Sequence, residues 1–74
     1  MWEKGEFAID GEEYEYCAKV YDTGSEYGID DGRVSKLQIK RGGVEIVAYD
    51  RGWDVEPADY GAEQALQYVL DLYA

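Results

Sequence analysis

The dipeptide Asp10-Gly11 is the feature that most constrains the fold of this chain. A two-residue type I′ turn needs positive φ at both positions, which Asp and Gly accept readily. Residues 5–20 alternate between apolar and polar side chains around this turn, as paired strands do. The turn places Phe7 opposite Tyr14. One face of the predicted hairpin is then apolar and consists of Phe7, Ile9, Tyr14, Tyr16, Ala18 and Val20.

A second hairpin is predicted within residues 33–51, with Gly42-Gly43 as its turn. This turn places Ile39 opposite Ile46 and Leu37 opposite Ala48. These four residues form the predicted inner face. The predicted outer face consists of Lys36, Gln38, Lys40, Val47, Tyr49 and Arg51. Residues 22–32, rich in Gly, Asp and Ser, predict a loop between the two hairpins that is long for such a connection.

The last segment has the pattern of an amphipathic helix. Pro57 suits a first helical position, because its missing N–H has no partner to lose there. Asp59 is the alternative N-cap if the helix begins one turn later. An apolar stripe at helical spacing consists of Ala62, Ala65, Leu66, Val69, Leu70 and Tyr73.

Together these patterns predict the α+β class, with one domain over residues 1–74. The expected architecture is a four-stranded antiparallel β-meander with one C-terminal α-helix packed on one face, in the order ββββα. A chain of 74 residues has room for one small core and no deep catalytic cleft.

Charge is unevenly distributed along the chain, whose net charge is −10. Residues 1–31 carry ten acids and two bases, residues 32–52 carry two acids and five bases, and residues 53–74 carry five acids. Such an acidic chain lacks the basic footprint of a nucleic-acid-binding protein. The excess acid either keeps the protein soluble by self-repulsion or forms a docking surface for a basic partner.

The residue types argue against a catalytic site and against a metal site. The chain has no histidine, the commonest general base and metal ligand. Cys17 lies within a predicted strand without an activating neighbour and is expected to be a small filler residue. Acids around Asp30-Asp31 do not follow the ligand spacing of a calcium loop. We therefore predict no catalytic residue, no metal site and no cofactor.

The cysteine content and the lack of long apolar stretches indicate the cellular compartment. A single cysteine favours a reducing environment, and no stretch is long and apolar enough for a membrane span or a signal peptide. The expected protein is cytoplasmic and makes no membrane contact.

Candidate binding residues fall into two groups. The predicted register opposes Glu6 and Glu15, which destabilises a sheet and so suggests a purpose other than stability. The acidic group consists of Glu6, Glu13, Glu15, Glu26, Asp30 and Asp31. The aromatic and basic group consists of Tyr27, Lys36, Lys40, Tyr49, Arg51 and Trp53. Each group is either an ordinary solvated face or a contact surface.

Trp53 stands in the polar segment "YDRGWDVEP". It either closes the end of the core where strand gives way to helix, which we favour, or anchors a binding surface. Trp2 presents the same choice near the N-terminus.

The segment "SKLQIKRGGVEIVAYDRGWDVEP" and the helix after it resemble an uncharacterised family of small acidic proteins from Gram-positive bacteria and their phages or prophages. The resemblance covers roughly residues 32–74, and "YDRGWD" is its most specific element. It implies no established activity and no catalytic residues. It does suggest a mobile-element origin, where small acidic proteins often bind and disable a host protein.

These observations lead to three hypotheses. The first is a non-enzymatic phage-type protein that binds a basic surface of a host protein, for example an anti-CRISPR or nuclease inhibitor that mimics DNA. The second is a structural or self-associating phage module, a homo-oligomer built through sheet edges. The third is a binder of a small anionic ligand on the second hairpin, through Lys36, Lys40, Tyr49 and Arg51.

Overall fold

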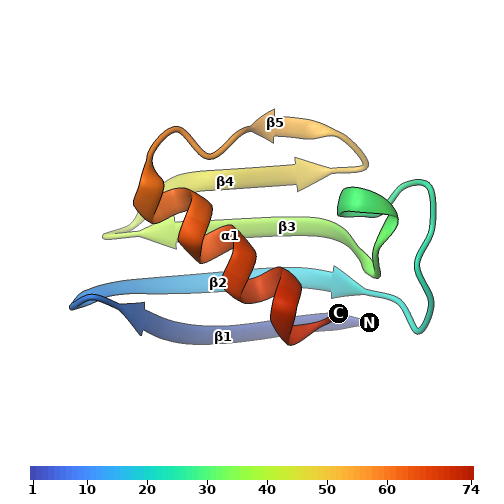
Figure 1. The fold of residues 1–74 in the computed structure, drawn as a ribbon, viewed down its shortest axis with the longest axis horizontal. Helices are drawn as coiled ribbons and strands as arrows, with labels where there is room; N and C mark the ends of the chain where they lie inside the picture. Colours follow the sequence, from blue (N-terminus) through green and yellow to red (C-terminus); the bar gives the residue numbers. More distant parts are fainter.

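Five antiparallel strands follow one another along the chain and pair in the same order to form one sheet (Figure 1). The computed structural model describes residues 1–74. The strands are β1 (Trp2–Ile9), β2 (Glu12–Val20), β3 (Val34–Arg41), β4 (Val44–Asp50) and β5 (Trp53–Val55), and the helix α1 spans Tyr60–Leu72. The α+β class with a C-terminal helix is confirmed, but the prediction of four strands is wrong because β5 adds a fifth.

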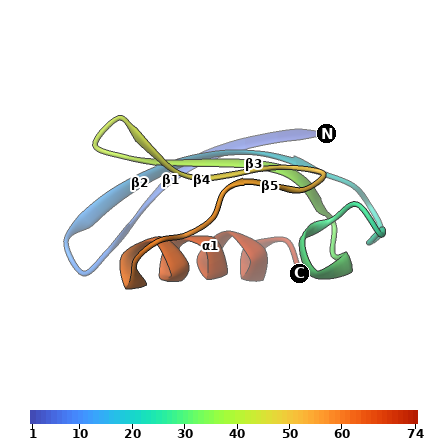
Figure 2. The same ribbon diagram turned by 90° about the horizontal axis from the view of Figure 1, so that it is seen from above.

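The helix α1 crosses one face of the sheet and leaves the other face open (Figure 2). We call the uncovered side the open face. No helix in this structure is both long enough and apolar enough to cross a lipid bilayer.

The first hairpin has the register that the Asp10-Gly11 turn predicts. Asp10 and Gly11 have φ values of 51° and 82°, and Phe7 lies opposite Tyr14. All six residues predicted for its apolar face belong to the core or pack against it. Gly5 is required there, because a Cβ at this position would lie 2.6 Å from Cε1 of Tyr16. The tyrosine ring thus fills the space that the glycine leaves.

The second hairpin departs from its predicted register through a β-bulge. Arg41 and Val44 pair as expected, but an irregularity between Ile39 and Lys40 places Ile39 opposite Val47 instead of Ile46. Side chains alternate between the two faces, so a one-residue slip exchanges them. Val47 is therefore fully buried in the core, and the prediction that it lies on the outer face is wrong.

The segment after β4 forms a strand where a direct passage into the helix was expected. Trp53 pairs with Tyr49 in β5, and the two rings lie 5.0 Å apart between their centroids in an edge-to-face arrangement. Trp53 remains 40% exposed and lies outside the core cluster. It therefore packs on a half-buried tyrosine at the sheet edge, and the expectation of a core plug is wrong.

The loop between β2 and β3 is irregular, as predicted, but it contributes to the core. Its single 3-10 turn (Ile29–Asp31) buries Ile29 to 4% exposure. This turn lies at the end of the sheet opposite to both hairpin turns (Figure 1). The loop is thus anchored at its centre, which fixes the position of its polar residues.

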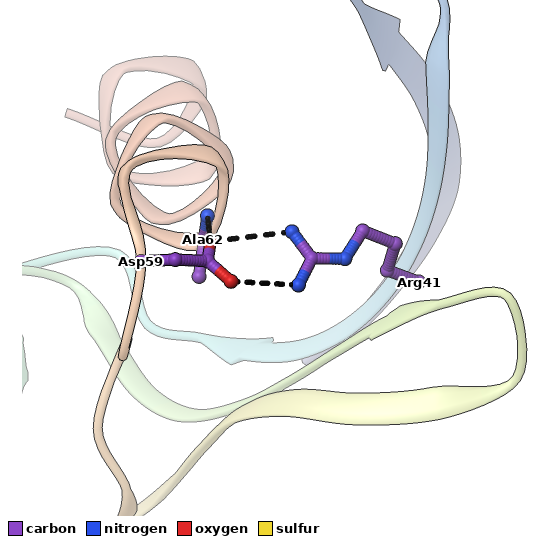
Figure 3. A network of polar contacts seen from close by, with 3 residues as sticks. All are labelled: Arg41, Asp59 and Ala62. Atoms are coloured by element: carbon purple, nitrogen blue, oxygen red, sulfur yellow. Dashed lines mark hydrogen bonds and ion pairs between the residues drawn. The ribbon is translucent and has the colours of Figure 1, made fainter.

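The helix begins at Tyr60, with Asp59 as its N-cap, so the alternative of a later start is confirmed and Pro57 lies outside the helix. Asp59 Oδ1 accepts a hydrogen bond of 2.8 Å from the Ala62 amide, and Arg41 reaches both carboxylate oxygens, at 3.2 and 2.8 Å (Figure 3). Arg41 lowers the pKa of Asp59 to about 2, with a further contribution from the Ala62 amide. A bidentate ion pair thus joins the end of β3 to the start of the helix.

The other end of the helix is joined to the sheet through two tyrosines. The hydroxyls of Tyr16 in β2 and Tyr73 after α1 lie 2.8 Å apart. Burial, and then the Tyr16 hydroxyl, raises the pKa of Tyr73 above its ordinary value. Both ends of α1 are therefore held on the same face of the sheet, away from the open face.

Candidate functional site

The open face is built by the residues that alternate with the core positions of the strands. From β2 it receives Glu13, Glu15, Cys17 and Lys19, because their neighbours Tyr14, Tyr16 and Ala18 pack inward. Charged and polar side chains from β1, β3 and β4 adjoin them. The uncovered side of this sheet is therefore a largely polar surface.

Three of the predicted acidic residues converge at one end of the open face. Glu6 lies directly opposite Glu15, and Glu13 lies opposite Ala8 on the same hairpin. Together with Lys40 and the Gly42-Gly43 turn they line a cavity of about 450 Å³. We call this cavity the acidic hollow; it lies at the end of the sheet that carries the two hairpin turns.

The carboxylates of the acidic hollow are not neutralised within the chain. The structure contains two ion pairs, Lys36 with Asp50 at 3.7 Å and Arg41 with Asp59 at 2.8 Å. Lys40 is the cross-strand neighbour of Glu15, yet its ammonium does not come within ion-pair distance of that carboxylate. The hollow therefore presents three unpaired negative charges to solvent.

The other predicted acids lie elsewhere. Glu26, Asp30 and Asp31 belong to the loop between β2 and β3, at the opposite end of the sheet from the acidic hollow (Figure 1). Asp30 and Asp31 adopt positive φ, 53° and 59°, in the 3-10 turn. The six predicted acids thus form two separate groups rather than one surface.

The predicted aromatic and basic group is also divided, and the bulge in the second hairpin is the reason. Lys36 and Lys40 lie on the open face as expected. Tyr49 and Trp53 lie on the helix side, where Tyr49 packs against the core. The prediction that Tyr49 shares a face with the two lysines is wrong.

Arg51 and Tyr27 meet near the β2–β3 loop. The guanidinium of Arg51 lies over the Tyr27 ring, 5.6 Å from its centroid, and the Tyr49 hydroxyl donates a hydrogen bond of 3.1 Å to the Tyr27 carbonyl. Arg51 and Tyr27 also line a second cavity with Tyr21 and Ser35. The sequence did not single out the last two residues, because their proximity to Arg51 depends on the path of the loop.

Chemically, these surfaces offer charge and hydrogen bonding. No group of three or more His, Cys, Asp or Glu side chains is arranged to hold a metal ion. Cys17 is a free thiol, half-buried on the open face. The arrangement is suited to recognition of a charged partner.

Comparison with known proteins identifies a family without an assigned activity. Residues 1–74 match the family described as "Domain of unknown function (DUF7678)". The match extends over the whole chain, beyond the residues 32–74 on which a resemblance to an uncharacterised family was expected. No curated protein and no solved structure matches the chain.

Proposed function

We propose a function from the geometry, because the chain belongs to the DUF7678 family, a domain of unknown function. The chain is a non-enzymatic module that binds a basic surface of a partner protein through the acidic hollow. The observation that carries this proposal is the group of three unpaired glutamates on the open face. A basic surface is the complementary partner, because unpaired carboxylates attract and orient Lys and Arg side chains.

The arrangement of charge supports a protein rather than a small cation as the partner. Glu6, Glu13 and Glu15 belong to one hairpin that continues into the rest of the open face. Charges spread along an open sheet face can make several contacts at once to an extended partner. DNA presents its phosphates to such partners in a similar way, as closely spaced negative charges.

The specific form of the proposal is therefore an inhibitor that occupies the nucleic-acid-binding surface of a host protein, such as a defence nuclease. The mobile-element origin suggested by the sequence resemblance motivates this choice of target.

A matched pair of double variants tests the docking surface. Glu13→Lys with Glu15→Lys reverses two charges in the acidic hollow. Glu56→Lys with Glu63→Lys reverses two charges at exposed positions outside it. Both variants have the same net charge, so a difference between them reports position and not total charge.

The assay is binding of the purified chain to a panel of purified nucleases and other DNA-binding proteins from the host. We expect the variant in the hollow to bind at least about tenfold more weakly, since like charges then face each other across the contact. The control variant should bind as the parent does, and duplex DNA should compete with the chain. Equal binding by the two variants would refute docking through the acidic hollow.

Self-association is the competing proposal, and the free edges of the sheet motivate it. β1 forms one edge and β5 the other. The β1 edge carries Glu3, Lys4 and Glu6, and β5 has only three residues. Charged and short edge strands discourage pairing with another chain, so we place this proposal second. A sedimentation coefficient that rises with protein concentration would favour it.

A further inference from the structure

A second cavity lies at the end of the sheet opposite the acidic hollow. It has a volume of about 470 Å³ and is lined by Tyr21, Asp22, Thr23, Ser25, Tyr27, Ser35 and Arg51. Its size falls within the range of about 300–1,000 Å³ that is usual for small-molecule sites. The lining combines one guanidinium, several hydroxyls and two aromatic rings. We call it the loop cavity.

Ser35 gives the first indication of a ligand in the loop cavity. It is the extra residue of a bulge between β2 and β3, where Val20 pairs with Val34 and Lys19 with Lys36. Ser35 is 3% exposed, and its hydroxyl lies near the Tyr21 phenol but forms no hydrogen bond of normal geometry. Buried hydroxyls are nearly always satisfied, so an unpartnered one beside a cavity indicates a group that the cavity accepts.

Arg51 gives the second, independent indication. It forms no ion pair although the chain contains seventeen acids. Its φ is 58°, a left-handed conformation that is unfavourable for a residue other than glycine, and its amide donates to the Ser35 carbonyl at 3.2 Å. Strain of this kind is retained where the surroundings fix the residue, often at binding sites.

Further positive charge lies beside the cavity. The ammonium of Lys19 is 5.5 Å from the centroid of the Tyr21 ring. Lys19 lowers the pKa of the Tyr21 phenol, with smaller contributions from the Ser35 hydroxyl and Arg51. Asp22 is the one carboxylate in the lining and acts against an anion.

We propose that the loop cavity binds a small phosphate monoester with an aromatic body. The fork of Arg51 matches two phosphate oxygens, and the hydroxyls of Ser35 and Tyr21 donate to the remaining oxygens. The rings of Tyr21 and Tyr27 contact the aromatic body. A phosphate uses these donors better than a carboxylate, which has two oxygens. This site shares no residue with the acidic hollow, so its test is independent of the proposed function.

The test measures dissociation constants of the full chain for phenyl phosphate, inorganic phosphate and benzoate by calorimetry. We expect phenyl phosphate to bind most tightly, inorganic phosphate more weakly and benzoate weakest. Lys4→Gln removes an exposed positive charge on β1 that lines neither cavity, and it should leave these constants unchanged. Absence of phenyl phosphate binding at 10 mM, roughly the weakest range of small-ligand affinity, or tighter binding of benzoate, would overturn the proposal.

Three variants of the loop cavity complete the test. Arg51→Gly relieves the left-handed backbone and removes the guanidinium, so it should raise the thermal stability and weaken phenyl phosphate binding at least about tenfold. Ser35→Ala should also weaken binding, and Asp22→Asn should strengthen it. A stable Arg51→Gly protein that binds phenyl phosphate as the parent does would overturn the assignment.

Discussion

Removal of one glutamate from the acidic hollow should make the protein more stable. Glu6 and Glu15 are direct partners across β1 and β2, and neither takes part in an ion pair. Side chains in such positions have Cβ atoms about 4.5–5.5 Å apart, and like charges there destabilise a sheet. Glu6→Gln keeps the shape of the side chain and removes the repulsion.

The size of the effect follows from the separation of the charges. Two carboxylates about 6 Å apart in water repel each other by about 0.7 kcal/mol before screening. For a domain of this length, a change of that size raises the melting temperature by about 3–6 °C. The gain should disappear in 1 M NaCl, where the Debye length is about 3 Å.

Thermal unfolding followed by circular dichroism in about 10 mM and 1 M salt measures this effect. Glu12→Gln is the matched control, because Glu12 lies on the same hairpin opposite Ile9 and its loss changes the net charge equally. In a double-mutant cycle, Glu6→Gln and Glu15→Gln together should stabilise by less than the sum of the single changes, since the repulsion is removed only once. If Glu6→Gln raises the melting temperature no more than Glu12→Gln does, or if the two changes in the cycle are additive, then Glu6 and Glu15 do not repel each other measurably.

Three further changes test the fold around these sites. Asp59→Asn keeps an N-cap but loses the charge that pairs with Arg41. Because the pKa of Asp59 is lowered from 3.8 to about 2, the parent's advantage in urea denaturation should be complete above about pH 4 and vanish as the pH falls through 2. Gly5→Ala should displace the Tyr16 ring and lower the melting temperature, whereas Gly52→Ala, with no atom within 4 Å of the added Cβ, should not. Ile39→Val in the fully buried core should lower the free energy of unfolding by about 0.5–1.5 kcal/mol, and Val44→Ala at a 63% exposed position should change it by less than about 0.5 kcal/mol.

The first hairpin and its opposed glutamates could be predicted because two independent signals agree there. The Asp10-Gly11 turn sets the register, and strict alternation around it assigns each side chain to a face. In the second hairpin these signals separate. The turn correctly pairs Arg41 with Val44, but residues 46–49 are all apolar. Such a run does not distinguish the two faces, so the bulge that buries Val47 leaves no trace in the pattern.

The fifth strand and the loop cavity could not be predicted from local sequence patterns, for a different reason. Three residues are too few for a visible alternation, and Trp53 pairs with Tyr49 only because the chain turns back at Arg51 and Gly52. The loop cavity joins residues from the β2–β3 loop, β3 and the β4–β5 turn. Its composition depends on where Ile29 anchors the loop, which is a tertiary contact.

The distribution of ion pairs bears on why the open face is charged at all. Seven bases are available, and one of them, Arg41, is used in a bidentate pair that holds the helix on the opposite face. Lys40 stands next to Glu15 without pairing with it. A sheet selected only for stability would place bases opposite Glu6 and Glu13, since opposite charges across strands stabilise and like charges do not. The partner that we propose would supply the positive charge that the acidic hollow lacks.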